Sequence, residues 1–226
     1  MTLWNVDLHS HTKWSKDCLT EFAEIIGICQ KRGIDRIAIT DHNTAEGALA
    51  MQKIAPELVI VGEEIMTTQG EILAYYMRES IPAGLSPMAT IQRLRDQGAV
   101  ISVAHPFDRL RKGAWREEEL LQIMNHIDAI EIYNARCIFP SDNHQALKFA
   151  QEHGLCGTVG SDAHTRIEYG RAMTRLRPFQ NAEELRAAIR EAEYVKRLSF
   201  PHVHIGSSVA KRLRKWGLRE RMWEGG

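Results

Sequence analysis

The chain alternates short apolar runs with segments of helical period along most of its 226 residues, and this alternation limits the possible folds more than any other feature. The runs expected to form strands are 3–8, 34–40, 58–62, 71–77, 100–104, 129–133 and 155–160. Helices are expected at 19–32, 44–54, 86–97, 117–127, 142–153 and 182–192. This alternation predicts an α/β protein with a largely parallel sheet built from βα units. Six or seven such units favour a barrel over an open sheet, and the short loop at Gly70 allows a hairpin between 58–62 and 71–77.

The length of the chain fits one globular domain, because α/β barrels commonly reach about 200–250 residues as a single unit. Basic and acidic residues number 29 each, so no overall positive field attracts nucleic acid, although a local basic patch still could. The four cysteines lie far apart without a CxxC pair, which predicts reduced thiols. Neither a signal peptide nor an apolar run of about 18 residues is visible. We therefore expect a cytoplasmic protein with no membrane span; the sequence specifies no oligomeric state.

The composition changes after about residue 200, so we expect a barrel over 1–200 and a basic amphipathic extension over 201–226. Its basic residues are Lys211, Arg212, Arg214, Lys215, Arg219 and Arg221, interleaved with Val209, Leu213, Trp216 and Leu218. Such a helix could touch nucleic acid, an acidic membrane or a partner subunit. The simpler interpretation is a solvated helix that packs its Trp216 and Leu213 face on the barrel.

Histidines and carboxylates gather at the carboxyl ends of the expected strands. They are His9, His11, His42, Glu64, His105, Asp162 and His164. In a parallel barrel these ends lie on one face, so we expect the side chains to converge. Neutral imidazoles and carboxylates are the usual ligands of zinc, manganese and iron, and a shared carboxylate can bridge two ions. Each motif alone is weak, but their succession predicts a metal site.

Taken in order, the motifs DLHSHT, ITDHN, VGEEI, VAHP and GSDAH resemble those of the PHP (polymerase and histidinol phosphatase) family of metal-dependent phosphoesterases, and the resemblance spans roughly residues 3–195. It implies a distorted (β/α)7 TIM-like barrel that holds two or three divalent ions, with zinc, manganese or iron as candidates. At the matching positions the implied ligands are His9, His11, Asp17, His42, Glu64, His105, Asp162 and His164. Glu71 stands where many relatives have histidine, so it is a further ligand or an acid/base. Cys18 replaces a common glycine and is either near the metals or simply a small buried residue.

The mechanism that we expect is in-line attack by a hydroxide that bridges two ions, which also clamp the phosphoryl oxygens. Arginine suits the orientation of a phosphate through its planar donor fork. The candidates for phosphate binding are Arg109, Arg111, Asn134, Arg136 and Arg166. Asp7 and Asp41 are candidates either to fix the tautomers of ligand histidines or to cap turns.

The leading expectation is hydrolysis of a small phosphomonoester of the nucleotide or sugar phosphate type. One alternative is a nuclease or oligonucleotide phosphodiesterase, against which the neutral net charge weighs. A metal-dependent amidohydrolase-like barrel also uses an HxH pair, but the SxD after that pair and the GSDAH motif argue against it. A non-catalytic metal-binding regulatory module would have lost ligands, whereas nearly all are present here.

Overall fold

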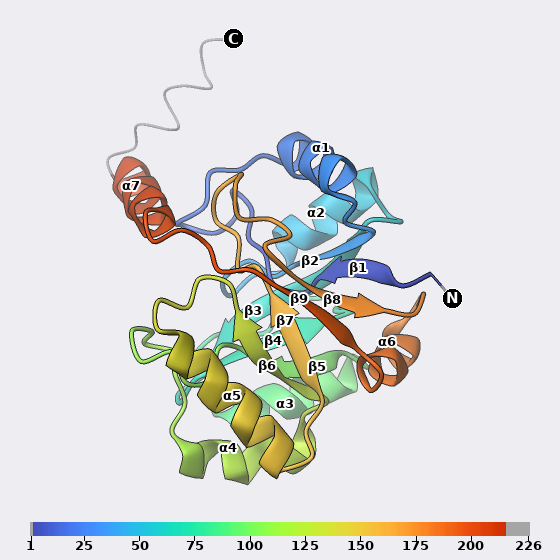
Figure 1. Cartoon of the computed structure of the whole chain (residues 1–226), viewed down its shortest axis with the longest axis vertical. Coiled ribbons are helices and arrows are strands. Elements are labelled where there is room, and N and C mark those ends of the chain that lie inside the picture. The colour runs from blue at the N-terminus through green and yellow to red at the C-terminus, as the bar shows by residue number, and fades with distance from the viewer. Residues whose placement is uncertain (1, 216–226) are drawn as a thin grey trace.

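A computed structural model of the chain describes residues 2–215, and in this part nine strands form one curved sheet in the order β7-β6-β5-β4-β3-β2-β1-β8-β9 (Figure 1). The strands are β1 (Trp4–Asp7), β2 (Arg36–Ile39), β3 (Val59–Met66), β4 (Glu71–Tyr75), β5 (Val100–Val103), β6 (Ala129–Asn134), β7 (Gly157–Gly160), β8 (Ala172–Leu176) and β9 (Glu193–Lys196). The helices are α1 (Phe22–Arg32), α2 (Glu46–Ile54), α3 (Pro87–Asp96), α4 (Glu117–Ile123), α5 (Pro140–Glu152), α6 (Ala182–Ile189) and α7 (Val203–Lys215). The predicted distorted TIM-like barrel is confirmed.

The sheet is mixed, which the simple alternation of strands and helices did not predict. The pairs β1–β2, β2–β3, β5–β6 and β6–β7 are parallel. Strand β4 is antiparallel to both β3 and β5, so the hairpin through Gly70 is confirmed. Strands β8 and β9 were not predicted, and β9 has no fully buried residue that could mark it as apolar. Because β4 runs backwards, its first residue lies at the rim where its neighbours end.

The sheet is nearly closed, and side chains complete the contact between β7 and β8. The Thr174 hydroxyl donates to the Val159 carbonyl at 3.1 Å, and the Val159 amide donates to the same hydroxyl oxygen at 3.0 Å. The Tyr194 hydroxyl on β9 donates to the Gly157 carbonyl at 3.2 Å. These bonds satisfy backbone groups that a neighbouring strand would otherwise pair.

Two apolar layers hold the barrel together. The inner layer joins alternate strand residues to α6 and consists mainly of Val6, Leu8, Ala38, Ile60, Leu73, Tyr75, Val100, Ala129, Leu176, Phe179, Leu185 and Ile189. The outer layer lies between the sheet and helices α1 to α5. Helix α6 closes the amino-terminal end, where Arg186 donates to the carbonyls of Gly98 and Ala99 just before β5. The opposite end is left for polar side chains.

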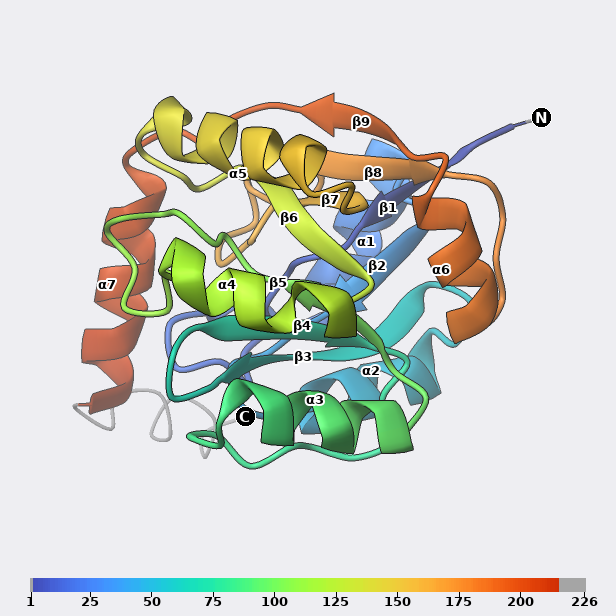
Figure 2. The same cartoon turned by 90° about the horizontal axis from the view of Figure 1, so that it is seen from below.

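Helix α7 lies at the end of the barrel opposite α6 (Figure 2). It buries Val203, Ser207 and Ala210, which recur at helical spacing, while Lys211 and Lys215 stay exposed. Leu213 is half-buried, and Trp216, Leu218, Arg219 and Arg221 lie outside the described residues. Within residues 2–215, each helix is too short or too polar to cross a bilayer.

Gly62 in β3 tests how closely the strands approach one another. An added Cβ would lie 2.6 Å from the Ala74 carbonyl oxygen and 3.0 Å from the Thr40 methyl group. We expect Gly62→Ala to lower the free energy of unfolding by about 1–3 kcal/mol, because the core must shift to accept the methyl group. Urea denaturation measures the change. The matched control is Gly27→Ala in α1, where an added Cβ meets nothing within 4 Å; it should raise stability by up to about 1 kcal/mol. Equal effects would contradict the expectation.

Candidate metal centre

Backbone bridges beyond the strand ends bring the histidine motifs together. Ser10 forms a parallel bridge with Ala163, and the Asp162 amide donates to the His9 carbonyl at 2.7 Å. His42 forms a second parallel bridge with Glu64. The DLHSHT motif is thereby joined to GSDAH, and the ITDHN motif to VGEEI. The predicted convergence at the carboxyl-terminal rim follows from these bridges.

Glu64 lies at the centre of one half of the cluster. Its two carboxylate oxygens lie 2.8 Å from His42 Nδ1 and 2.8 Å from His105 Nε2, respectively. His9 Nε2 and His11 Nε2 lie 3.4 Å from the same carboxylate. Glu64 is fully buried. Four imidazoles therefore surround one carboxylate.

Asp162 is the centre of the other half. Its Oδ1 lies 3.2 Å from His11 Nε2, 3.6 Å from His9 Nε2 and 3.4 Å from His164 Nδ1. Its backbone adopts φ of 50°, in the left-handed region that is uncommon for non-glycine residues. Although burial opposes ionisation, Arg111 and His9 hold the pKa of Asp162 well below its usual range. The carboxylate is therefore ionised.

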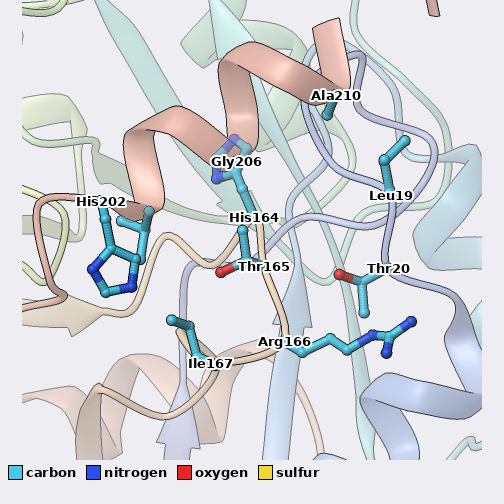
Figure 3. Close-up of a pocket in the computed structure, with 10 residues that line it drawn as sticks. Leu19, Thr20, His164, Thr165, Arg166, Ile167, His202, Gly206 and Ala210 are labelled. Carbon is cyan, nitrogen blue, oxygen red and sulfur yellow. The ribbon is translucent and has the colours of Figure 1, made fainter. Parts of the chain in front are cut away.

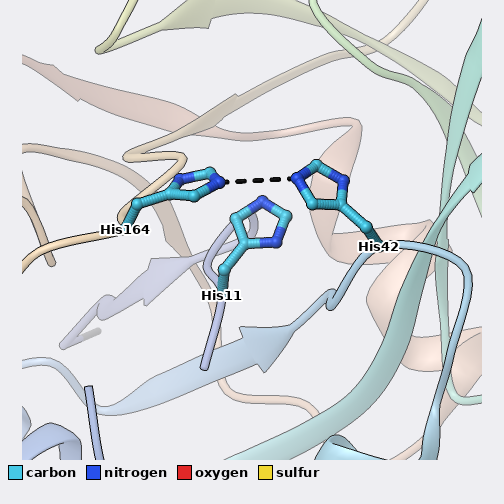
Figure 4. Close-up of side chains that lie close together, drawn as sticks. All are labelled: His11, His42 and His164. Carbon is cyan, nitrogen blue, oxygen red and sulfur yellow. Dashed lines mark hydrogen bonds between the residues drawn. The ribbon is translucent and has the colours of Figure 1, made fainter. Parts of the chain in front are cut away.

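Asp17 joins the cluster from the loop that follows the first motif. Its Oδ1 lies 3.3 Å from His164 Nε2 and 3.5 Å from His42 Nε2. His164 Nε2 and His42 Nε2 are themselves 3.4 Å apart, and His11 points toward both of them (Figure 4). Three histidines from three segments thus face one point beside an acid. On the other side, Lys211 of α7 lies 3.1 Å from Asp17 Oδ2.

Glu71 lies at the start of β4, on the same rim. Its Oε2 is 3.5 Å from His105 Nε2, and it forms a possible ligand group with His42 and Glu64. Burial, reinforced by the neighbouring Glu64, raises the pKa of Glu71. The antiparallel course of β4 is what places this carboxylate beside the others.

The donor set fits divalent cations. Several buried side-chain atoms at the rim form no hydrogen bond of ordinary geometry, and they are His9 Nε2, His11 Nε2, Asp17 Oδ1, Glu64 Oε2 and Asp162 Oδ1; of these, Glu64 Oε2 lies 2.8 Å from His42 Nδ1. Such atoms cost free energy unless a ligand pairs them. Burial, together with His164 and His42, lowers the pKa of His11 well below its usual value, so that imidazole is neutral as a metal ligand must be. All eight residues that the motifs single out can therefore contribute to one multi-metal centre.

Glu131 on β6 also belongs to the centre, and the motifs did not identify it. Its Oε1 lies 3.1 Å from His9 Nδ1, and its Oε2 accepts the His105 amide at 2.8 Å and Asn134 Nδ2 at 3.1 Å. Its position alternates with the buried apolar residues of β6. A carboxylate at such an inward position is the signal that could have identified it.

Asp41 and Asp7 were each expected either to fix a histidine tautomer or to cap a turn, and their hydrogen bonds favour the second alternative. Asp41 accepts hydrogen bonds from the Thr12 amide at 2.7 Å and from the Ser15 hydroxyl at 2.6 Å, and Ser15 Oγ lies 3.1 Å from His11 Nδ1. Asp41 thus reaches the imidazole only through Ser15. Asp7 accepts the amides of Ser161 at 3.0 Å and Gly170 at 2.8 Å, so it fixes the last motif by turn capping.

Two of the candidate phosphate ligands lie at the centre. The Arg111 guanidinium pairs with Asp162 and lies 3.4 Å from Asp108 Oδ2. Asn134 Nδ2 lies 3.3 Å from Asp162 Oδ2. These two side chains therefore present donors to the ligand cluster from β6 and from the loop after β5.

The other three arginines are engaged elsewhere. Arg109 pairs with Asp142 of α5, and Arg166, with 70% of its side chain exposed, pairs with Glu24 of α1. Arg136 is buried, 3.2 Å from Glu168 Oε1, and donates to the Ser207 hydroxyl at 2.6 Å. Arg111 pairs with the candidate metal ligand Asp162, whereas the partners of these three guanidiniums are not candidate ligands, so these contacts give no support to the expectation that Arg109, Arg136 and Arg166 bind phosphate.

Cys18 is a buried core thiol. Its Sγ lies 3.5 Å from the His11 carbonyl and 3.8 Å from the Tyr169 hydroxyl. Burial raises the pKa of the Cys18 thiol to about 11. The thiol is protonated near neutral pH, which agrees with the small buried residue of the two interpretations.

Comparisons with known proteins identify the family of the chain. A model of the PHP domain matches residues 7–161, and a model described as PHP-associated matches residues 140–194. The uncharacterized protein MJ1587 of Methanocaldococcus jannaschii is 36% identical over 142 residues, which cover 57% of this chain and 81% of that relative.

Solved structures share the fold. A two-domain protein from Bacteroides vulgatus, described as containing a PHP-like metal-dependent phosphoesterase, has a TM-score of 0.70 at 21% identity and covers 87% of this chain and 65% of its own. The lesion-specific endonuclease PfuEndoQ from Pyrococcus furiosus has a TM-score of 0.60 at 17% identity, with coverages of 84% and 56%. The family resemblance of the motifs is confirmed: the chain belongs to the PHP family of metal-dependent phosphoesterases.

Proposed function

We propose that this protein hydrolyses a small phosphomonoester with two or three divalent ions, zinc, manganese or iron, held by the eight residues of the rim. The observation that carries the proposal is the set of buried ligand atoms around Glu64 and Asp162 that form no hydrogen bond of ordinary geometry. When bound, such ions acidify a water molecule and neutralise the phosphoryl oxygens. Glu64 and Asp162 lie where each could serve two ions, because each carboxylate has imidazoles on more than one side.

The chain's own residues supply orientation and proton transfer. Arg111 presents a planar donor fork beside Asp162, which suits the oxygens of a bound phosphate. Asn134 adds an amide donor on the same side. Glu71, whose Oε2 lies 3.5 Å from His105 Nε2, remains a candidate further ligand or acid/base. Glu131 keeps His9 oriented by accepting from its Nδ1.

A small substrate is favoured over a polymer by the shape of the site. The ligand residues are almost completely buried, apart from half-buried His42. A pocket of about 430 Å³ reaches His164, and a pocket of this size matches a single small molecule. Nuclease activity is the second candidate, because PfuEndoQ shares the fold and α7 exposes Lys211, Arg212 and Lys215 near the site. Free cysteines among the described residues support the cytoplasm as the proposed location.

The function is tested with a panel of phosphomonoesters, dinucleotides and labelled RNA in the presence of Mn²⁺, Zn²⁺ or Fe²⁺. We expect turnover of phosphomonoesters, and we expect His9→Ala and Asp162→Ala each to abolish it while circular dichroism shows a retained fold. The control is His144→Ala, an exposed position on α5, which should retain full activity. Cleavage of oligonucleotides alone would select the nuclease instead. Unchanged turnover in both ligand variants would refute the metal centre.

Metal binding should stabilise the fold, because the ligand atoms are already assembled in the folded state. At a metal concentration of about 100 times Kd the free energy of unfolding should rise by about 2.7 kcal/mol. Differential scanning calorimetry with and without Mn²⁺, and after chelation, measures the rise. The same increase in an Asp162→Ala variant would show that the cation binds somewhere else.

Glu131→Gln tests whether the contact that orients His9 matters for metal binding, because it leaves all eight candidate ligands in place. The amide would bring an N–H group to one of the positions where Glu131 now accepts from His9, His105 and Asn134. We expect metal affinity to fall by about 10–100-fold, read out by competition with a chelating dye. The control is Glu119→Gln in α4, a buried carboxylate that pairs with Arg116. An unchanged affinity for Glu131→Gln would mean that His9 does not depend on this contact.

A further inference from the structure

We propose that helix α7 forms one wall of a pocket for the leaving group of the substrate, and that this leaving group carries a ring with largely apolar faces. This inference rests on the proposed phosphomonoester hydrolysis and narrows the class of ester. It also makes α7, the described part of the expected extension, part of the site.

The pocket lies between α7, the loop at 164–167 and the segment at 19–20 (Figure 3). Its lining residues are Leu19, Thr20, His164, Thr165, Arg166, Ile167, His202, Val203, Gly206 and Ala210. Two of its walls continue directly from candidate metal ligands, because Leu19 follows Asp17 by two residues and Thr165 follows His164. His164 also lines the pocket itself and lies 3.3 Å from Asp17 Oδ1 and 3.4 Å from Asp162 Oδ1, so the pocket borders the candidate metal centre and has room for a group esterified to a phosphate there.

The lining selects the kind of leaving group. Leu19, Ile167, Val203 and Ala210 give it apolar walls, and its volume of about 430 Å³ exceeds what a three-carbon alcohol fills. A sugar with many hydroxyls would lose water there without enough partners for its polar groups. A flat ring would bury apolar area on both faces. Ile167 has 47% of its surface exposed, and a ring in the pocket would cover this side chain.

Helix α7 is fixed to the metal-binding loop, so the wall has a defined position. Ser207 of α7 accepts a hydrogen bond from Arg136, and Arg136 pairs with Glu168. Glu168 in turn accepts the amides of His164 at 3.1 Å and Thr165 at 2.8 Å. This chain of contacts gives buried Arg136 a positioning role.

The packing between helix and loop is also close. An added Cβ at Gly206 would lie 2.9 Å from the Thr165 methyl group. Further along the helix, Lys211 reaches Asp17. The helix therefore meets the metal-binding segments at both ends of the pocket.

The test compares two esters of primary alcohols, adenosine 5′-monophosphate and glycerol 3-phosphate, which differ in the ring and not in the bond that breaks. The variants are Ala210→Leu, which fills the pocket, and Ile167→Ala, which removes an apolar contact on its exposed side. The control is Val209→Leu, on the exposed face of the same helix. Inhibition by inorganic phosphate reports whether the metal centre is intact in each variant.

We expect wild type to prefer the ring-bearing ester in kcat/KM. Ala210→Leu and Ile167→Ala should lower that preference by about tenfold or more, since loss of apolar contact in a pocket changes discrimination by this order. Glycerol 3-phosphate turnover, phosphate inhibition and the Val209→Leu ratio should stay within about twofold. A ratio that both pocket variants leave unchanged, or equal losses for both esters in folded variants, would overturn the inference.

A binding experiment distinguishes failure of the pocket from failure of the proposed hydrolysis. If wild type turns over neither ester, calorimetric binding of adenosine to metal-loaded protein still tests the pocket. Binding that Ala210→Leu weakens and Val209→Leu preserves would support the pocket without hydrolysis. No adenosine binding by wild type would overturn the inference whichever esters are hydrolysed.

Discussion

A group of buried ionisable side chains whose ligand atoms face one another is the constraint on which the rest of the structure depends. Four imidazoles surround Glu64 and three approach Asp162, although each group would be better solvated in water. The barrel holds them there by hydrogen bonds from the opposite sides of the rings and from the loops. Glu131 supports His9, and Asp41 supports the His11 loop through Ser15 and Thr12. Cations between these groups would offset the cost of bringing them together.

The topology of the sheet determines which residues reach the ligand cluster at the rim. Parallel strands carry the four histidine motifs to one rim, while the reversed β4 brings its first residue, Glu71, to the same place. Helix α6 packs apolar side chains into the other end. One end of the barrel therefore contributes to stability, and the other holds the candidate ligands.

Much of the fold and of the rim could be predicted from sequence because the apolar runs and the histidine motifs occur together. Apolar runs marked β1 to β7, and each metal-site motif follows or ends one of these runs. Strands β8 and β9 could not be identified in this way, because only alternate residues of β8 are buried and no residue of β9 is fully buried. The arginines show a second limit. Arg111 and Arg136 look alike in sequence, but Arg111 pairs with the candidate ligand Asp162, whereas Arg136 contacts Glu168 and Ser207, which lie 32 and 71 positions away. Such pairings depend on tertiary packing, which no local pattern records.

The way the barrel closes has a consequence for metal loading. Along β7 the hydroxyls of Thr174 and Tyr194 bridge the gap in the sheet, whereas at the rim the first and last motifs join through a backbone bridge between Ser10 and Ala163. His9 and Asp162 stand on the two sides of this seam. A cation bound by both residues would link the segment after β1 to the segment after β7, the final parallel strand. Loading the site would then tighten the circumference of the barrel as well as equip it for catalysis.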